Sequence, residues 1–402
     1  MVTVAVTVVG AGSGPLPDGA EKVLAEADLV AGTRWDLDAH APEGVRTVEL
    51  GPLETALNAL SSLSGDENGV LLADGDPGFF GVVRRLRERG IRCTALPSTG
   101  AAQEMTARLG RSWDDLAVLS PREGDLHRVV NVCRARGAVL VLAVPGVGPA
   151  QIGAGLRGWR RTMVVAEDLG GPGEELTTLP PAEAANRPWR EHSVVLCASD
   201  LDEVPPRQWI AGGEVLPADG WALPEGAFAH REGVLSTSEV RAVALSKLAP
   251  RPGALVWDVG AGSGSVAVEC ARLGAAAIAV ESDEAQVVRM VTNATSHGVD
   301  VRVEEGEAPA ALRNLPKPDS VFVGGGGPDV VTSCAHADAD RVVVALSSVE
   351  RVAPTRDALR HAGYAVEAVQ LSANRLVEAE GGAQLAAAEP VLLVSGVRGQ
   401  SS

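Results

Sequence analysis

Residues 255–265 read Leu-Val-Trp-Asp-Val-Gly-Ala-Gly-Ser-Gly-Ser, an apolar, β-branched run that passes directly into a glycine turn. This pattern is typical of a strand whose end lets the backbone approach a ligand where a Cβ atom would clash. Its central hexapeptide, Val-Gly-Ala-Gly-Ser-Gly at 259–264, also occurs at 9–14, again after an apolar run. The sequence therefore predicts two small-molecule sites.

The two copies are followed by different segments. After the second copy, a helical stretch, Ser265–Leu273, leads into the strand Ala276–Val280, which ends in Glu281. Glu281 lies 21 positions after Gly260 (281 − 260), near the ~20 at which a carboxylate binds ribose hydroxyls. After the first copy, a helix at about Asp18–Ala27 leads into Leu29–Gly32, which carries no such acid. We expect the first site to hold its ligand differently.

Apolar strand-like runs alternate with helical patterns along most of the chain, which predicts an α/β fold with mainly parallel sheets covered on both faces. These runs are Val2–Val9, Val70–Ala73, Val139–Val144, Met163–Ala166, Val194–Ala198, Leu255–Val259, Ala276–Val280, Ser320–Val323, Arg341–Leu346 and Pro390–Ser395.

Three units are expected from the length of 402 residues and from the positions of proline- and glycine-rich segments that interrupt helices and strands. A break near Leu96-Pro97-Ser98 precedes a helix at Thr99–Leu109, with Ser98 or Thr99 as its N-cap. The segment 201–224 is rich in Pro, Gly and Trp, as expected of a linker. The predicted units are 1–96 and 97–200, which form one N-terminal domain, and 225–402.

Composition excludes several classes of partner. The formal net charge is −17, the pI is near 4.9 and aromatic residues make up 3% of the chain, so a nucleic-acid partner is not expected. The five cysteines are scattered and never in Cys-x-x-Cys spacing, which favours reduced thiols over disulfides or a metal site. Met1–Val9 is too short to span a membrane and lacks a basic flank, so we expect a cytoplasmic protein.

The C-terminal motif carries most of the chemical information. Asp258, the turn Gly260-x-Gly262-x-Gly264 and the distal Glu281 together resemble the Rossmann-like class of S-adenosylmethionine-dependent methyltransferases. The glycines alone would also fit a nicotinamide enzyme, and each residue could have a purely structural role such as capping or packing. Glu307 and Ala308 follow the next strand, Val299–Val303, and are candidates for the adenine end of the ligand.

The substrate side of this site is predicted from a glycine run and two arginines. Gly324–Gly327 follows the strand Ser320–Val323 and offers backbone N–H groups suited to carboxylates, unless it is simply a loop. Arg231 and Arg241 are candidate guanidinium contacts for an anionic substrate, although an arginine on a helix is often only solvated. Ser236 and Glu239 have the spacing of a capping box. Neither an Asn/Asp-Pro-Pro-aromatic motif nor a nucleophilic Cys follows the strand, so an already nucleophilic carbon is the expected target.

Residues 225–396 resemble the C15-methylating, C12-decarboxylating enzymes of corrin biosynthesis. The resemblance is carried by Phe228, Ser238-Glu-Val-Arg, the core at 257–265, Gly306-Glu-Ala-Pro, Phe322-Val-Gly-Gly and Glu389-Pro-Val. The family usually has Thr-Lys where this chain has Ser236 and Thr237, so a role for that lysine does not carry over.

Residues 1–200 resemble the tetrapyrrole methylase family, in the branch that methylates C5 of the same substrate. The matching pieces are Val8–Pro15, Leu71–Gly81 and Leu96–Ala102, but the family's Ser-x-His-Gly-Arg segment has no His or Gly at Ser120–Glu123. The resemblance implies two α/β subdomains with the donor in the cleft between them. It implies donor contacts at Gly10, Gly12, Gly75, Asp76, Pro77, Ser98 and Thr99.

Together the two resemblances imply a fused enzyme that binds one S-adenosylmethionine in each domain. It would methylate a precorrin at C5 and C15 and decarboxylate the C12 acetate in cobalamin biosynthesis. They name no catalytic residue and no metal, and they imply a homo-oligomer. Two alternatives stay open, namely a methyltransferase for another tetrapyrrole, a small molecule or a tRNA base, and an S-adenosylmethionine-binding protein with one inactive domain.

Overall fold

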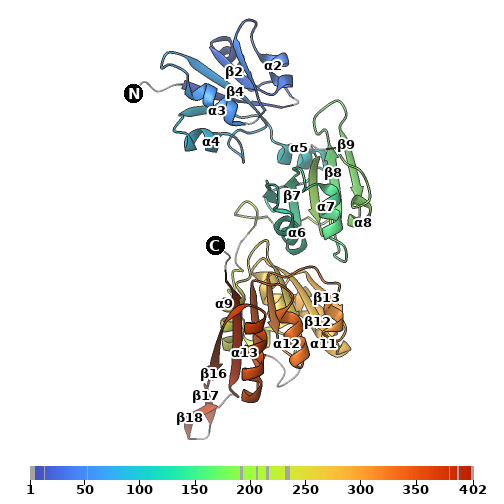
Figure 1. The fold of residues 1–402 in the computed structure, drawn as a ribbon. Coiled ribbons are helices and arrows are strands. Elements are labelled where there is room, and N and C mark those ends of the chain that lie inside the picture. Colours follow the sequence, from blue (N-terminus) through green and yellow to red (C-terminus); the bar gives the residue numbers. More distant parts are fainter. Residues whose placement is uncertain are drawn as a thin grey trace.

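The computed structural model describes residues 5–12, 14–51, 53–190, 193–204, 207–213, 217–230, 236–379, 381–386 and 389–399. Within these residues the chain forms three large sheets, followed in sequence from the N-terminus to the C-terminus, and one short hairpin (Figure 1). Their helices and strands alternate as an α/β fold requires.

The first sheet is entirely parallel, in the order β3-β2-β4-β1-β5. Its strands and the helices between them are β1 (Ala5–Ala11), α1 (Ala20–Ala25), β2 (Leu29–Gly32), α2 (Arg34–His40), β3 (Arg46–Glu49), α3 (Leu53–Ser61), β4 (Asn68–Asp74), α4 (Val83–Glu88) and β5 (Cys93–Leu96). Alternate residues of β4 serve opposite faces, because Leu71 packs with α3 and α4 while Val70 and Leu72 pack with α1. Both faces are therefore covered, as predicted.

The second sheet corrects the expectation of mainly parallel strands. Its order is β6-β7-β10-β8-β9, and among the neighbouring strands that the structure describes there, β6 and β7 pair in parallel while the other pairs are antiparallel. Its elements are α5 (Ala101–Arg108), β6 (Ala117–Leu119), α6 (Leu126–Ala135), β7 (Ala138–Leu142), α7 (Pro149–Gly155), β8 (Thr162–Glu167), β9 (Glu175–Leu179), α8 (Pro181–Ala184) and β10 (Ser193–Ala198). Sequence periodicity does not reveal strand direction, because apolar runs buried on both faces look alike in either pairing.

The third sheet has the order β13-β12-β11-β14-β15-β19-β16, in which β19 is antiparallel to both of its neighbours. The other pairs are parallel. Its elements are α9 (Ser238–Leu248), β11 (Leu255–Val259), α10 (Ser265–Arg272), β12 (Ala276–Glu281), α11 (Glu284–Ser296), β13 (Val301–Glu305), β14 (Ser320–Val323), α12 (Pro328–Ala335), β15 (Arg341–Leu346), α13 (Val352–His361), β16 (Tyr364–Leu371) and β19 (Val391–Arg398). Short 3₁₀ turns lie at Glu225–Ala227, Ala310–Leu312 and Val349–Arg351.

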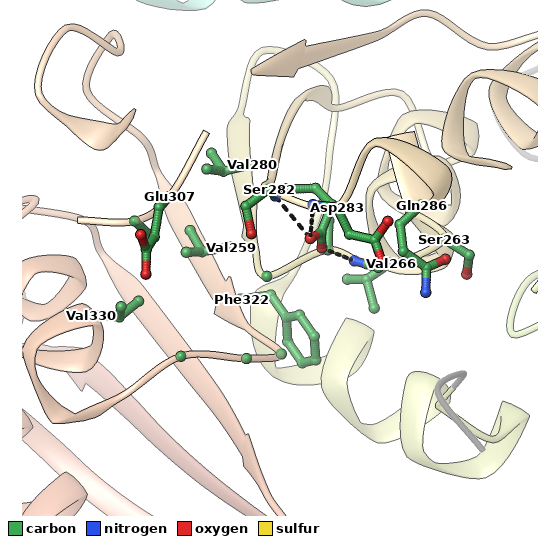
Figure 2. Close-up of a pocket in the computed structure, with 18 of the residues that line it drawn as sticks. Val259, Ser263, Val266, Val280, Ser282, Asp283, Gln286, Glu307, Phe322 and Val330 are labelled. Carbon is green, nitrogen blue, oxygen red and sulfur yellow. Dashed lines mark hydrogen bonds between the residues drawn. The ribbon is translucent and has the colours of Figure 1, made fainter. Parts of the chain in front are cut away.

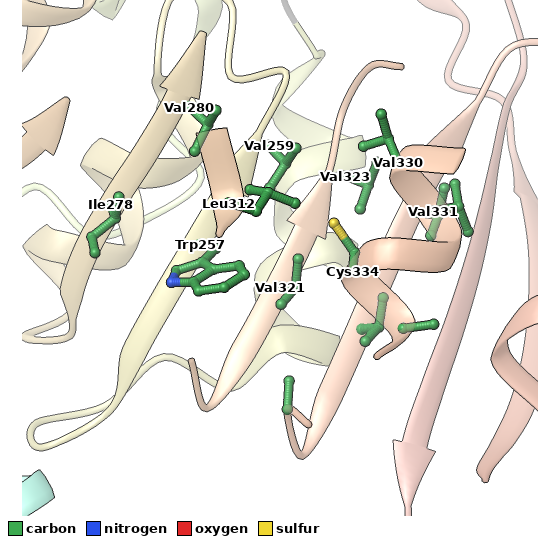
Figure 3. Packing of buried hydrophobic residues seen from close by; sticks show 14 of the residues in the cluster. Trp257, Val259, Ile278, Val280, Leu312, Val321, Val323, Val330, Val331 and Cys334 are labelled. Atoms are coloured by element: carbon green, nitrogen blue, oxygen red, sulfur yellow. The ribbon is translucent and has the colours of Figure 1, made fainter. Parts of the chain in front are cut away.

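The core of the third sheet explains why the predicted strands form. Trp257 and Val259 on β11 and Val321 on β14 point to the face covered by α12, where they meet Val331 and Cys334 (Figure 3). Val256, which precedes Trp257 on β11, packs instead with α9 and α10 on the other face. Burial on both faces produces the continuous apolar runs seen in the sequence.

The third sheet contacts the second through the amino ends of its strands. His127 Nε2 on α6 lies 2.9 Å from Asp319 Oδ2, just before β14. Asn131 Nδ2 donates to Gly253 O at 3.0 Å, just before β11, and Arg161 donates to Asp300 just before β13. Trp159 also packs within the core cluster of the third sheet. The two sheets therefore meet at the edge opposite to the glycine turns.

Two helix starts differ from the sequence prediction. The N-cap of α5 is Gly100, not Ser98 or Thr99, and its N–H is bonded to the Gln103 side chain at 2.7 Å. The N-cap of α9 is Thr237, whose hydroxyl accepts from Val240 N, so Ser236 and Glu239 do not form the predicted capping box. In both cases a neighbouring residue also suited to capping occupies the position.

A hairpin extends from the third sheet beyond the end of β16. Its strands are β17 (Arg375–Ala379) and β18 (Gly382–Ala386), and they form a separate two-stranded sheet (Figure 1). Arg375 ties the base of the hairpin to Glu225 and Glu239. Leu376, Val377 and Leu385 are all exposed on it.

Candidate functional sites

A pocket of about 500 Å³ lies at the carboxyl ends of β11, β12 and β14. Figure 2 shows Glu307 at one end of this pocket and Ser263 and Gln286 at the other, with Phe322 between them. Among the predicted residues, it is lined by Gly260, Gly262, Glu281, Glu307, Ala308, Gly324, Gly325 and Gly326. An elongated pocket at the carboxyl edge of a parallel sheet is the usual place for a nucleotide-like ligand.

Backbone geometry explains the glycines of the turn. Gly260, Gly262 and Gly264 all have positive φ angles, which residues with a Cβ rarely adopt. A Cβ on Gly260 would also lie 2.7 Å from Gly325 N, and one on Gly264 would lie 2.4 Å from the Met290 side chain. Gly264 does not line the pocket; it lets α10 begin against α11. The first two glycines shape the wall and the third permits packing.

Glu281 organises the turn and also faces the pocket. Its Oε2 accepts from Gly262 N at 2.8 Å, and its Oε1 accepts from Ser282 N at 2.8 Å and from Asp283 N at 2.9 Å (Figure 2). A carboxylate offers about four acceptor positions, so one remains for a ligand hydroxyl. The spacing predicted this acid but not its second role.

Asp258 lies beneath the turn and does not line the pocket. It is almost wholly buried, and its Oδ2 accepts from Ala267 N at 2.9 Å. Its Oδ1 is buried with no hydrogen-bond partner among the described residues. Burial raises the pKa of Asp258 to about 7, opposed by the Ala267 N–H bond and reinforced by the charge of Glu281. An orphaned acceptor at this place fits a ligand that carries positive charge nearby.

The glycine loop after β14 forms the wall opposite Glu281. Gly324, Gly325 and Gly326 line the pocket, and Gly324 N donates to Val259 O at 2.9 Å. Arg351 donates to Gly326 O at 2.6 Å and so holds the far end of the loop. The loop is therefore anchored at both ends.

The N-terminal motifs converge in the same way at the carboxyl edge of the first sheet. A Cβ on Gly10 would lie 2.3 Å from Gly75 O and 2.5 Å from Ser98 N, so three segments distant in sequence touch here. Gly75 N donates to Ala11 O at 3.1 Å, and Ser98 N donates to Gly75 O at 3.3 Å. A Cβ on Gly12 would lie 3.6 Å from Ser98 Oγ, an ordinary contact distance, so there is space beside Gly12. Glycine is required where these backbones cross.

The loop after Gly75 is held by its own hydrogen bonds. Asp76 Oδ1 accepts from Gly78 N at 2.8 Å, and Pro77 O accepts from Val83 N at 3.3 Å. Thr99 O lies 3.5 Å from the position that a Cβ on Gly75 would take. Asp76, Pro77, Ser98 and Thr99 thus surround the glycine crossing, with backbone rather than an acidic side chain as the main feature.

Comparison with known proteins assigns families to both halves. Residues 5–185 match the model of the tetrapyrrole (corrin/porphyrin) methylases, and residues 226–394 match the precorrin methyltransferase domain. A Sinorhizobium protein named precorrin-6Y C(5,15)-methyltransferase [decarboxylating] is 36% identical over 80% of this chain and 78% of its own length. The chain belongs to this methyltransferase family.

Two further relatives match most of the chain and its C-terminal half, respectively. A Mycobacterium tuberculosis protein of the same name is 32% identical over 77% of this chain and 74% of its own length. The crystal structure of the C-terminal domain of the Rhodobacter capsulatus precorrin-6Y C5,15-methyltransferase is 33% identical, covers 46% of this chain and 100% of that chain, and superposes with a TM-score of 0.41.

The position of Arg241 contradicts its predicted role as a contact for an anionic substrate. Its side chain is 0% exposed, and its guanidinium donates to Ser236 O and Leu223 O and lies over the Phe228 ring. Glu269, also 0% exposed, faces it with 3.8 Å between Nε and Oε1. Arg241 is thus a buried structural cation that does not reach the pocket, because its place on the inner face of α9 turns it to the core. Arg231 lies outside the described residues.

Several residues around the C-terminal pocket were not predicted from the sequence. Asn293 on α11 donates to Ser263 O at 2.9 Å and pairs with the backbone of Ala229 through both amide atoms, which fixes the turn against the preceding segment. Gln286 lines the pocket without belonging to a motif, and Ser236 and Phe322 also line it, although the sequence predicts no role in binding for them. A buried asparagine or glutamine in a helix offers only a weak sequence signal.

The described residues also bear on metal, redox and membrane roles. No cluster of three or more His, Cys, Asp or Glu side chains is placed to hold a metal ion in the part of the chain that the structure describes. The five cysteines are all free thiols. In the described ranges, none of the helices is long and apolar enough to cross a membrane.

Proposed function

We propose that this chain is a bifunctional S-adenosylmethionine-dependent enzyme of cobalamin biosynthesis. It would methylate a precorrin at C5 in its N-terminal domain and at C15 in its C-terminal domain, and it would decarboxylate the C12 acetate in the latter. One observation carries the proposal. In one chain of this family, a glycine lets two backbone segments touch at two separate places, Gly10 against Gly75 and Gly260 against Gly325.

The C-terminal pocket suits the donor in shape and in polar groups. We assign the ribose to Glu281, the adenine end to Glu307 and Ala308, and the amino acid end to the turn at Gly260 and Gly262, above the orphaned oxygen of Asp258. When bound, S-adenosylmethionine supplies an electrophilic methyl group, so that a carbon–carbon bond forms as the sulfur–methyl bond breaks. The chain's contribution is to orient donor and acceptor and to exclude water.

In the N-terminal domain we assign donor contacts to the backbone around Gly10, Gly12, Gly75, Asp76, Pro77, Ser98 and Thr99. In the C-terminal domain the N–H groups of Gly325 and Gly326 are proposed to face a substrate carboxylate, whereas the Gly324 N–H is already bonded to Val259 O and contributes only to the pocket wall. Loss of CO₂ from the C12 acetate would leave its electron pair in the conjugated macrocycle until a proton replaces it, and partial desolvation of the carboxylate would favour that step.

The test is the mass of the product. The purified full-length chain is incubated with S-adenosylmethionine and reduced precorrin-6, and the proposal predicts two added methyl groups and the loss of one CO₂. One added methyl group would instead indicate a domain that only binds the donor. Donor binding without transfer would indicate a sensor, and transfer only to another acceptor would indicate a different methyltransferase.

We also propose a homo-oligomeric, cytoplasmic enzyme. The support for self-association is the hairpin β17–β18, which exposes Leu376 at 72% and Leu385 at 67% of their surface. Exposed apolar side chains on a hairpin anchored at its base are suited to a contact with a second copy. Sedimentation of the full chain beside a Leu376→Ser, Leu385→Ser variant tests this, because a variant with unchanged mass would exclude the hairpin as the contact.

A further inference from the structure

The helix that comes after the Gly75–Gly81 loop carries arginines of two kinds. Arg85 is bonded to Glu88 at 2.9 Å and to Glu54 at 3.0 Å. Arg84 and Arg87 have no ion pair or hydrogen bond with any described residue, and both are exposed. In a chain with a net charge of −17, two unpaired guanidinium groups side by side require an explanation.

These two arginines line a hollow that reaches the donor loop. An open pocket of about 460 Å³ is bounded by Arg84, Arg87, Val83, Glu88 and by Gly78 of the loop itself. The carboxylate of Glu88 is already neutralised by Arg85, so the hollow is cationic. Gly78 follows closely after Gly75 and Asp76, which belong to the proposed donor site, so the hollow begins beside that site.

The same loop presents two aromatic rings to solvent. Phe79 is 45% exposed and Phe80 is 59% exposed, and their ring centroids lie 4.7 Å apart. Phe80 also has a φ angle of +54°, a conformation that is unfavourable for a bulky residue. Exposed rings and an unfavourable backbone conformation at one place are features that contact with a ligand would explain.

The loop is closed by contacts between its own residues. A Cβ on Gly81 would lie 2.3 Å from Pro77 O, so the turn is closed tightly, and Asp76 bonds Gly78 N. The two phenylalanines and the two unpaired arginines therefore come from a compact loop and the helix that follows it, which places them on neighbouring segments.

We propose that Phe79, Phe80, Arg84 and Arg87 form the surface that positions the macrocycle for the N-terminal methylation, with the rings against its apolar body and the guanidinium groups on its peripheral carboxylates. This rests on the proposed function. Arginine is suited to the task because its planar fork binds a carboxylate through two hydrogen bonds. An acidic protein repels a polycarboxylate at long range, so local unpaired cations are needed to bind one.

The test compares matched arginine variants in the full-length chain. Arg84→Ala, Arg87→Ala is expected to raise KM for the precorrin in the N-terminal methylation by roughly 10- to 100-fold, with kcat and donor affinity at that site little changed. Arg85→Ala, on the same helix, is expected to change KM less than about threefold. Arg84→Lys, Arg87→Lys should restore part of the affinity, since charge returns without the fork. The C-terminal methylation and decarboxylation serve as a control within the same molecule.

A second measurement separates this inference from the proposed function. Uroporphyrin, a macrocyclic octacarboxylate, is titrated against each variant by fluorescence; binding should weaken at least tenfold in Arg84→Ala, Arg87→Ala and in Phe79→Ala, Phe80→Ala. Equal KM and equal uroporphyrin affinity in wild type and Arg84→Ala, Arg87→Ala would overturn the inference. If uroporphyrin binding depends on these residues while no methyl group reaches a precorrin, the surface stands and the proposed function fails.

Discussion

Arg241 and Glu269 form an ion pair with no exposed surface on either side chain, and together they hold the segment before α9 to the third sheet. Glu269 accepts from Leu223 N at 2.7 Å and from Ala222 N at 3.1 Å, while Arg241 donates to Leu223 O. Burial lowers the pKa of Arg241, and the charge of Glu269 opposes this effect. The pair therefore links a linker segment to two core helices.

Removal of one partner should be strongly destabilising. Glu269→Ala leaves the guanidinium buried without its counter-charge and two N–H groups without acceptors, for which we expect a loss of about 3–5 kcal/mol in the free energy of unfolding. Denaturant unfolding of the variant measures this. Glu239→Ala, on the exposed side of α9, is the control. A loss below about 1 kcal/mol for Glu269→Ala would contradict the assigned role.

Glu281 should contribute to donor binding through both its free acceptor position and the turn that it holds. We expect Glu281→Ala to weaken S-adenosylmethionine binding at the C-terminal site by about 1–3 kcal/mol. Glu281→Gln keeps one acceptor and should lose less. Calorimetry on a Gly12→Leu background, in which a side chain fills the N-terminal cradle, isolates the second site. Unchanged affinity in both Glu281 variants would refute the ribose assignment.

Asp258 should make stability fall as pH rises. Its pKa is about 7 in the folded state and near 3.8 when unfolded, so the folded state binds the extra proton between these values. Ionising the buried carboxyl lowers the free energy of unfolding. This loss is absent below about pH 4 and complete above about pH 7, where it is on the order of 2–4 kcal/mol.

Asp258→Asn removes this titration while it keeps an acceptor for Ala267 N. The free energy of unfolding of the variant minus that of the wild type should therefore increase from about pH 4 to about pH 7. Unfolding curves at several pH values measure this difference. The contributions of the other titrating groups are the same in both proteins and cancel in it. A difference that does not change with pH would show that Asp258 is ionised throughout.

The two proposed methylation sites should exchange their intermediate through solvent. The third sheet contacts the second at Gly253, Asp300 and Asp319, the amino ends of its strands, whereas its pocket lies at the carboxyl ends. The pocket therefore faces away from the contact with the second sheet.

A mixture of two half-active variants tests this arrangement. Gly12→Leu and Gly325→Leu fill one site each, and neither added Cβ has a neighbour closer than 3.6 Å. Each variant alone should add one methyl group, and the mixture should produce the doubly methylated product at a rate that depends on concentration. If each variant is active alone but the mixture gives no such product, the intermediate passes within one chain.

The N-terminal motifs show which features a local sequence pattern can predict and which it cannot. Each glycine segment could be recognised because a turn after an apolar strand is a local signal, but only the fold shows that Gly10, Gly75 and Ser98 share one point. Similarly, the sequence does not show which arginines of α4 are paired, because Arg85 bonds Glu54 from another helix as well as Glu88 on its own.

By itself the sequence determined the α/β alternation, the two glycine turns and the acid at Glu281, because strand periodicity, a glycine-rich turn after an apolar run and short-range spacing are properties of neighbouring residues. The tertiary structure decided the features that depend on distant segments. It gave the second sheet its antiparallel pairs and turned Arg241 into the core. It also left Asp258 with an unpaired oxygen among the described residues, since burial and hydrogen-bond partners are set by which elements pack together.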